Sequence, residues 1–307
     1  MNIQQFQYIL ALEETRHFEK AAAKCYISQS TLSTMISKFE EEIGINIFDR
    51  AKRPIAPTAE GLIIIEKIRE IYYNIEQLSE LTKELKGEKK GKIHLACIPT
   101  VAPFLLPLFL MHFSKKYPEI KIDIRELTTD EIIQQIKTHN IDIGILSPIT
   151  LEEDIKEYPL YKEQFLLFDK DTEIKTSNNI SSLNLDNFWL MQEGHCMRDQ
   201  VLDICGKEED FYNINQNIQL KASSIDSLIR FVKANKGKTL LPYLSTLDFT
   251  ENDKKDLFYF TSSPPTRTIS LVTHRHFVKK KILKLLEKEI LNGISKTKYY
   301  PYLKALK

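Results

Sequence analysis

The stretch AAAKCYISQSTLSTMISKFEEEIGINIFDR, residues 21–50, has the pattern of two helices joined by a tight turn. Its alanines lie in a short helix at 18–25, and Ser28 is a good N-cap for a helix over 29–43. Apolar residues at helical spacing occupy one side of that second helix and leave a polar outer face. Another helix precedes the pair, and the three together predict a helix-turn-helix.

A basic hairpin follows the third helix. The segment RAKRPIAP, residues 50–57, is bounded by prolines and carries three cations, so it would form a wing suited to phosphates or the minor groove. A plain three-helix bundle with a solvated charged loop is the alternative, and the acids at 40–42 weaken a simple basic-face argument. The residues expected to contact DNA are Ser28, Gln29, Ser30, Thr31, Ser33, Lys38, Arg50 and Arg53.

A long helix should come next, because Thr58 can cap a segment that runs to about Gly87. Its apolar residues are spaced four and three apart and then seven, a heptad stripe that predicts a two-helix dimer contact. The residues of this seam are Ile64, Ile68, Ile71, Ile75, Leu78 and Leu85. A core helix packed on its own domain is the alternative. We prefer the dimer, because the segment links two regions and ends in the polar hinge GEKKGK.

This order of helix-turn-helix, FDR wing, PTAEG segment and linker helix resembles the LysR-type transcription regulators. The resemblance implies a winged helix-turn-helix DNA-binding domain over 1–58, a dimerisation helix and hinge over 59–90, and a regulatory domain over 91–307. It also implies double-stranded operator DNA as a partner, contact with RNA polymerase, and assembly into a homotetramer that is a dimer of dimers.

Length alone suggests about two domains. The 307 residues include 43 Lys and Arg against 42 Asp and Glu, so the net charge of +1 excludes a bulk polycation and requires a local patch for DNA. We find no apolar run near the roughly 18–20 residues that span a bilayer, and no signal peptide. Four cysteines do not make a disulfide scaffold. We expect a reduced, cytoplasmic, nucleoid-associated protein without cofactor, metal or membrane partner.

The remaining two hundred residues have the pattern of an α/β domain. Short β-type runs alternate with helical segments, the runs lying at 92–98, 121–127 and 141–146. This alternation predicts a parallel sheet with helices on both faces, in two lobes with a cleft between them. The family resemblance extends across this half and implies a periplasmic-binding-protein-like effector domain. Its lobe I would span about 91–160 and 266–307, and its lobe II about 161–265.

Ligands in such sheets bind at the carboxyl ends of strands and at helix N-termini. Thr100 follows a strand and precedes a helix, and Thr129 begins a helix after another strand. Thr128 and Glu131 could form a capping box, while Thr129 points into the cleft. Ordinary helix capping is the alternative for each threonine.

The sharpest chemical feature is GHCMRDQVLDIC, residues 194–205. If the segment after Gly194 is a helix, the nine residues from Cys196 to Cys205 give about 13.5 Å of rise and about two and a half turns, which puts the pair on opposite faces. A disulfide needs Cα atoms within about 7 Å, so the two can bond only if the helix unwinds. The spacing is not that of a zinc site. The alternative is two unrelated cysteines in one helix.

The same segment resembles the peroxide-sensing members of the LysR-type family, as do IPTVAPFLLP around Thr100 and the run TRTISLV. The resemblance implies that hydrogen peroxide oxidises Cys196 and that Cys205 resolves the product as a reversible disulfide. Glutaredoxin or thioredoxin would then be the reductant. The peroxide pocket would be lined by Thr100, Thr129, His195 and Arg267. A helix N-terminus beside His195 and Arg198 would favour the Cys196 thiolate.

Two rival functions stay open. One is a regulator that binds a small organic or anionic effector in the cleft, with the cysteines incidental. The other is a thiol peroxidase, an enzyme class that needs neither a DNA-binding head nor a dimer helix, so residues 1–87 argue against it. We therefore expect a regulator rather than an enzyme.

Overall fold

The computed structural model of the chain forms two compact units, Met1–Gly87 and Glu88–Lys307. The residues that it describes are 1–148, 150–171, 183, 185–192, 194, 196–206, 222–260, 264–296 and 303–305. Within these ranges, every helix is too short or too polar to cross a bilayer.

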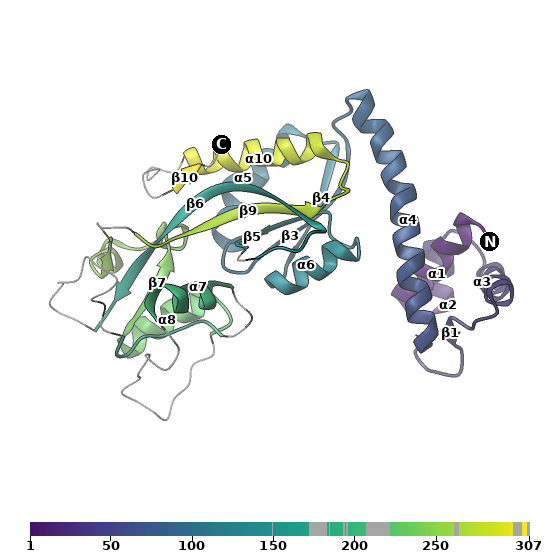
Figure 1. Cartoon of the computed structure of the whole chain (residues 1–307), viewed down its shortest axis with the longest axis horizontal. Coiled ribbons are helices and arrows are strands. Elements are labelled where there is room, and N and C mark those ends of the chain that lie inside the picture. The colour runs from purple at the N-terminus through teal and green to yellow at the C-terminus, as the bar shows by residue number, and fades with distance from the viewer. Residues whose placement is uncertain are drawn as a thin grey trace. The chain divides into compact units, whose positions relative to one another are not determined.

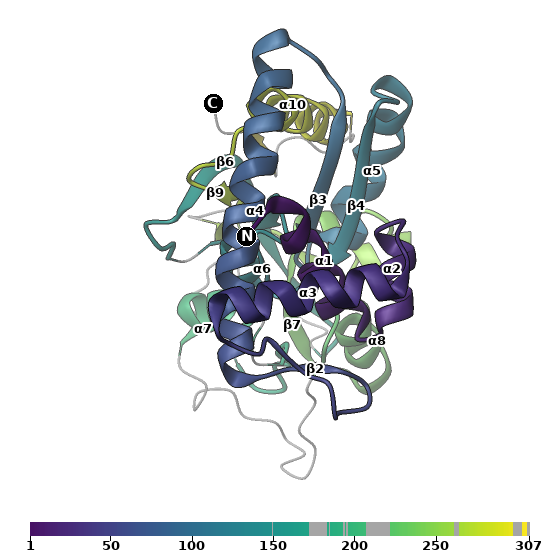
Figure 2. The same ribbon diagram turned by 90° about the vertical axis from the view of Figure 1, so that its right-hand side faces the viewer.

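The first unit is a winged helix-turn-helix followed by a long helix (Figure 2). Its elements are α1 (Ile3–Thr15), α2 (Phe18–Lys24), α3 (Gln29–Ile43), β1 (Phe48–Asp49), β2 (Ala56–Pro57) and α4 (Ala59–Lys86). Both predicted caps are confirmed, because Ser28 accepts a hydrogen bond from the Thr31 amide and Thr58 accepts one from the Gly61 amide. Pairing of β1 with β2 confirms the hairpin.

The core of this unit explains why α3 has two different faces. Leu32, Ile36 and Phe39 are buried, and the Phe39 ring forms a T-shaped pair with the Phe6 ring of α1. The first turns of α4 pack on the same core through Ile68 and its neighbours. The apolar side of α3 is thereby used inside the unit, and its polar side faces solvent.

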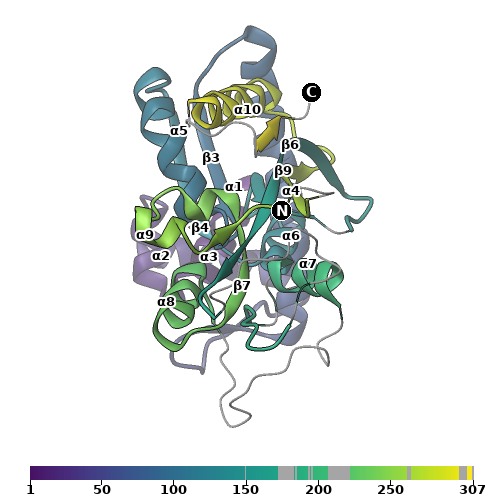
Figure 3. The ribbon, with the colours of Figure 1, turned by 90° about the vertical axis from the view of Figure 1, so that its left-hand side faces the viewer.

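The second unit contains most of the strands (Figures 1 and 3). Its first elements are β3 (Gly91–Cys97), α5 (Ala102–Lys116), β4 (Ile120–Glu126), α6 (Thr129–Lys137), β5 (Ile143–Leu146) and β6 (Ile155–Asp169). They are followed by α7 (Cys196–Cys205), α8 (Ile225–Asn235), β7 (Lys238–Pro242), the 3-10 helix η3 (Tyr243–Thr246), α9 (Glu251–Lys254), β8 (Leu257–Phe258), β9 (Thr266–His274), α10 (Lys280–Ser295) and β10 (Leu303–Ala305).

The sheet of this unit is mixed, so the prediction of a parallel sheet is wrong beyond its first three strands. β3 is parallel to β4 and β5, whereas β9 runs antiparallel to β5 and β6. The strand order is β10-β6-β9-β5-β3-β4. The physical reason is that the chain leaves this sheet along β6 and must return along the same path, which makes β9 antiparallel.

Two lobes result from a change of partners along β6. Its first part pairs with β9, from Ile155 to Gln164, and its last residues pair with β7 and β8, from Phe165 to Asp169. In Figure 1 the two long strands run from the side of α5, α6 and α10 to the side of α7 and α8. The predicted class, an α/β effector domain of two lobes after a winged helix-turn-helix and a linker helix, is confirmed.

Helices cover both faces of the first lobe, as predicted. α5 packs on α10, and α6 packs against β5, β6 and β9 on the other side (Figure 1). The close approach of α10 to α5 depends on Gly293, because a Cβ there would lie 2.9 Å from the Leu108 carbonyl oxygen. This packing leaves the carboxyl ends of β3, β4 and β5 together at one edge of the sheet.

Candidate DNA-binding and redox sites

The start of α3 presents hydroxyl and amide groups to solvent. The Ser28 hydroxyl lies 2.9 Å from that of Ser30 and 2.8 Å from that of Thr31. Of the other predicted DNA contacts on this helix, Gln29 and Lys38 are exposed and Ser33 is half-buried. Free amides and hydroxyl donors at a helix N-terminus suit the phosphates of DNA. Contact of these side chains with DNA stays a prediction.

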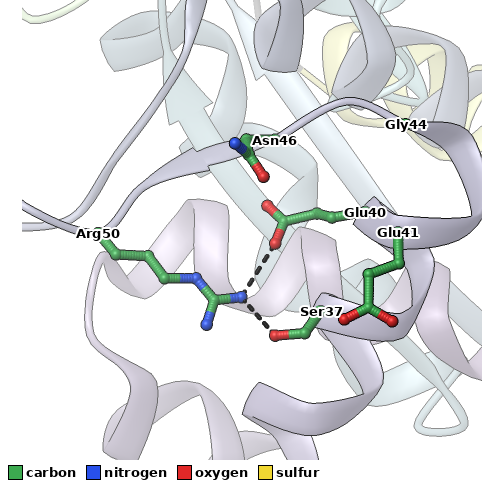
Figure 4. Close-up of a pocket in the computed structure, with 6 residues that line it drawn as sticks. All are labelled: Ser37, Glu40, Glu41, Gly44, Asn46 and Arg50. Atoms are coloured by element: carbon green, nitrogen blue, oxygen red, sulfur yellow. Dashed lines mark hydrogen bonds and ion pairs between the residues drawn. The ribbon is translucent and has the colours of Figure 1, made fainter.

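The other end of α3 is tied to the wing by a carboxylate that sequence reasoning missed (Figure 4). Glu40 is 6% exposed. Its Oε1 accepts from the amides of Ile47 and Phe48 at 2.8 and 3.1 Å, and its Oε2 accepts from Arg50 Nη2 at 2.9 Å. The acid therefore supports the wing. One signal could have found it, because Glu40 lies four residues after the buried Ile36.

The two arginines expected at DNA have different surroundings. Arg50 donates to Ser37 as well as to Glu40, and its guanidinium lies 5.6 Å from the centre of the Phe18 ring. Its charge is therefore partly balanced within the protein. Arg53 is exposed, and its Nη1 donates to the Arg50 carbonyl at 3.3 Å. The charge of Arg53 is thus less neutralised by the protein and more available to a phosphate. Contact of Arg50 and of Arg53 with DNA stays a prediction.

The predicted seam on α4 divides into two parts. Ile71, Leu78 and Leu85 are 40%, 65% and 78% exposed. Ile68 is 3% exposed inside the winged-helix core, so the alternative of a core helix describes the first turns. The other two seam residues, Ile64 and Ile75, are half-buried. The exposed seam residues lie only from the middle of α4 onward, and the polar Thr82 interrupts the stripe between Leu78 and Leu85.

Register brings the two cleft threonines to one edge of the sheet. Cys97 and Glu126 are paired as the last residues of β3 and β4, and Thr100 and Thr129 each follow by three residues. The predicted capping box of Thr128 and Glu131 is confirmed. Thr129 is therefore not the cap, and its buried Oγ1 has no hydrogen-bond partner among the described residues.

Thr100 is held by an arginine from another strand. Its Oγ1 and its carbonyl oxygen accept from Arg267 Nη1 and Nη2, both at 3.1 Å. Arg267 Nε also donates to Glu163 Oε2 at 2.8 Å, and both charged side chains are buried. Ordinary capping does not explain Thr100, because the N-cap of α5 is Val101. Sequence reasoning missed Glu163, which carries no local motif.

The cysteine segment forms the expected helix α7, with Cys196 and Cys205 as its first and last residues. Nine residues of helix separate their backbones by about 13.5 Å, and all four cysteines of the chain are free. Cys196 is 7% exposed. Burial raises the pKa of Cys205 to about 12 and that of Cys97 still further, so both disfavour the thiolate.

Two side chains near Cys196 anchor α7. Arg198 donates to the Met191 carbonyl at 2.9 Å. Gln200 donates to Ser147 Oγ at 2.7 Å, which ties α7 to the end of β5 at the edge of Thr100 and Thr129. Gln200 Oε1 is buried and lacks a hydrogen-bond partner in the part of the chain that the structure describes. Sequence reasoning missed both Ser147 and Gln200, whereas His195 lies outside the described residues.

Known protein families match the two units of the chain separately. Residues 3–62 match the family model of the bacterial regulatory helix-turn-helix protein, lysR family, and residues 86–288 match that of the LysR substrate binding domain. A hydrogen peroxide-inducible genes activator of Haemophilus influenzae is 31% identical over 277 residues, which are 89% of this chain and 90% of that protein.

Two other similarities bear on function. The regulator EstR of Acinetobacter baylyi is 30% identical over 89% of this chain and 91% of its own. The structure of full-length OxyR C199D from Pseudomonas aeruginosa superposes with a TM-score of 0.76 at 26% identity, covering 95% of this chain and 98% of that one. These relatives are transcription regulators. The chain is therefore a regulator rather than an enzyme, and it belongs to the LysR family.

Proposed function

We propose that this protein is a DNA-binding transcription regulator that senses hydrogen peroxide at Cys196. One observation carries the proposal: Cys196 begins a helix that Gln200 anchors at the sheet edge of Thr100 and Thr129. Thr129 Oγ1 and Gln200 Oε1 are buried there without protein partners in the described ranges, so they can hydrogen-bond a small polar molecule such as peroxide. The similarity to a hydrogen peroxide-inducible genes activator supports the same function.

The chemistry has two balanced steps. The Cys196 thiolate attacks one peroxide oxygen, the O–O bond breaks, and the other oxygen leaves as hydroxide, which takes a proton to become water. Cys196 is then a sulfenic acid. The Cys205 sulfur attacks the Cys196 sulfur, a disulfide forms, and a second water leaves. Thr100, Thr129, Arg267 and His195 would polarise the peroxide.

The second step couples oxidation to conformation. A disulfide requires Cα atoms within about 7 Å, and α7 holds the two cysteines about twice as far apart. The helix must therefore unwind, which also breaks the Gln200–Ser147 contact. Unwinding lets the half-buried Cys205 meet water and become a better nucleophile. Glutaredoxin or thioredoxin would reduce the disulfide and allow α7 to re-form.

The remaining parts convert this change into a response on DNA. We assign DNA binding to 1–58, dimerisation to 59–90 and sensing to 91–307, with lobes that divide near 160 and 265. Two chains would pair through the exposed part of the α4 seam, and two such dimers would bind one operator in the cytoplasm. Repacking of the sensing domains would change the spacing of the DNA-binding heads and their contact with RNA polymerase.

The test is peptide mapping of the reduced full chain after one equivalent of peroxide. We expect a Cys196–Cys205 disulfide and a changed DNA footprint. Cys196→Ser should abolish both, Cys205→Ser should leave a trappable sulfenic acid at Cys196, and Cys25→Ser should behave as the native protein. A Cys196→Ser protein whose footprint still responds to peroxide would rule out the proposal.

A second candidate is a regulator that binds an organic or anionic effector between the lobes, because a relative of similar identity, EstR, is named as a transcriptional regulator without mention of peroxide. In that case peroxide would oxidise the cysteines no faster than it oxidises an ordinary thiol, and the Cys196→Ser protein would keep its full response to the effector.

A further inference from the structure

A buried ion pair lies where the two lobes join. Glu163 of β6 and Arg267 of β9 are directly opposite each other in the antiparallel ladder, and their side chains are 0% and 1% exposed. Such a pair adds little net stability, because desolvation of two charges offsets their attraction. Both groups are nevertheless held by several contacts, so the pair has a defined geometry and can position other groups.

On one side, the pair orients Thr100. Arg267 donates to the Thr100 hydroxyl oxygen and to the Thr100 carbonyl, and its guanidinium lies 5.8 Å from the centre of the Phe165 ring. A hydroxyl that accepts from a cation must direct its single hydrogen elsewhere. Donation from a charged group also polarises that hydroxyl and makes it a stronger donor.

On the other side, the pair reaches the second lobe. Glu163 Oε1 accepts from the Leu244 amide at 2.7 Å, while its Oε2 accepts from Arg267. Leu244 belongs to η3, which packs against β6 and against α5, the helix that begins just after Thr100. Both oxygens of Glu163 are therefore used, one toward each lobe.

We propose that Glu163 is a positioning residue for the reaction of Cys196 with peroxide, an inference that rests on the proposed function. Glu163 holds the Arg267 guanidinium on Thr100, and Thr100 in turn directs its hydrogen toward the peroxide oxygen that leaves as hydroxide. Because the same carboxylate binds Leu244, the geometry of this donor depends on how the two lobes are joined.

The experiment compares two rates at Cys196 in the full chain. Oxidation by hydrogen peroxide needs a polarised O–O bond, whereas alkylation by iodoacetamide needs only an accessible thiolate. Quenched samples analysed by mass spectrometry give both second-order rates, and their ratio separates positioning of the donor from loss of fold or access. Glu157→Gln is the matched control, because Glu157 lies on the same strand, is exposed and binds Ser270.

Glu163→Gln should lower the ratio of peroxide to iodoacetamide rates about 10- to 100-fold, as expected when a reacting group is misplaced. Glu163→Asp keeps the charge and should recover part of the ratio. If Glu163→Gln alone does not fold, Glu163→Asp provides the test, because it leaves the buried charge of Arg267 paired, and its ratio should still fall below that of the native protein.

The outcomes distinguish this inference from the proposed function. A native protein that reacts with peroxide no faster than a free thiol overturns the proposed function itself. If the native protein reacts fast, and the folded Glu163 variants keep its ratio, Glu163 is only structural and this inference is wrong.

Discussion

Glu40 offers the most direct test of how α3 supports the wing. Replacement by alanine removes the acceptor of two buried amides, those of Ile47 and Phe48. Each buried donor left unpaired costs about 1–3 kcal/mol. The lost pair with Arg50, whose side chain is 41% exposed, adds about 1 kcal/mol or less. We therefore expect Glu40→Ala to destabilise the α3–wing junction by about 2–7 kcal/mol.

Hydrogen–deuterium exchange of the full chain measures this local loss. With about 1.4 kcal/mol for each factor of ten, the amides of Ile47 and Phe48 should exchange at least about 25-fold faster in Glu40→Ala. Glu40→Gln keeps a neutral acceptor and loses only the charge, so it should accelerate exchange about fivefold. Glu41→Ala, the adjacent exposed acid, is the matched control and should change exchange little.

Glu40→Ala should also change DNA binding, because Glu40 holds the wing in place. A loosened wing should weaken binding to all sequences and lower the salt dependence of affinity, because the wing is expected to contact phosphates. If the amides of Ile47 and Phe48 exchange at the same rate in Glu40→Ala as in Glu41→Ala, the reasoning is refuted, because the Glu40 carboxylate then does not hold the wing.

Three further predictions address the seam, the wing and the resolving cysteine. Leu78→Asp should abolish the helix-mediated dimer, as measured by sedimentation, without loss of fold, because Leu78 is exposed. Ile68→Asp should instead unfold the winged-helix unit, because it buries an unpaired charge. A Leu78→Asp protein that stays dimeric would exclude Leu78 from the seam. Arg53→Ala should lower the slope of log affinity against log salt by about one phosphate contact, and an unchanged slope would exclude Arg53 from the interface. Burial raises the pKa of Cys205 to about 12, so at pH 8 its thiolate fraction, and hence its alkylation rate, should be roughly a thousandfold below that of the unfolded chain. Equal rates in folded and unfolded protein would show that α7 already opens freely.

Signals within a few residues of one another predicted the local structure correctly. The caps at Ser28 and Thr58 and the box of Thr128 with Glu131 depend on side chains that reach their own backbone. The extent of α7, and hence the separation of its cysteines, follows in the same way from helix geometry. Such features need no knowledge of distant segments. The two-lobed class was predicted instead from the alternation of β-type runs and helices, and the domain order from the family resemblance.

The tertiary structure alone decided which side chains became buried partners. Glu163 and Arg267 are 104 positions apart, and only the register of β6 against β9 joins them on Thr100. Packing likewise selected Glu40 among three consecutive acids and Ile68 among the seam residues. Burial and strand direction depend on where distant segments return, and that is a property of the whole chain's packing rather than of local pattern.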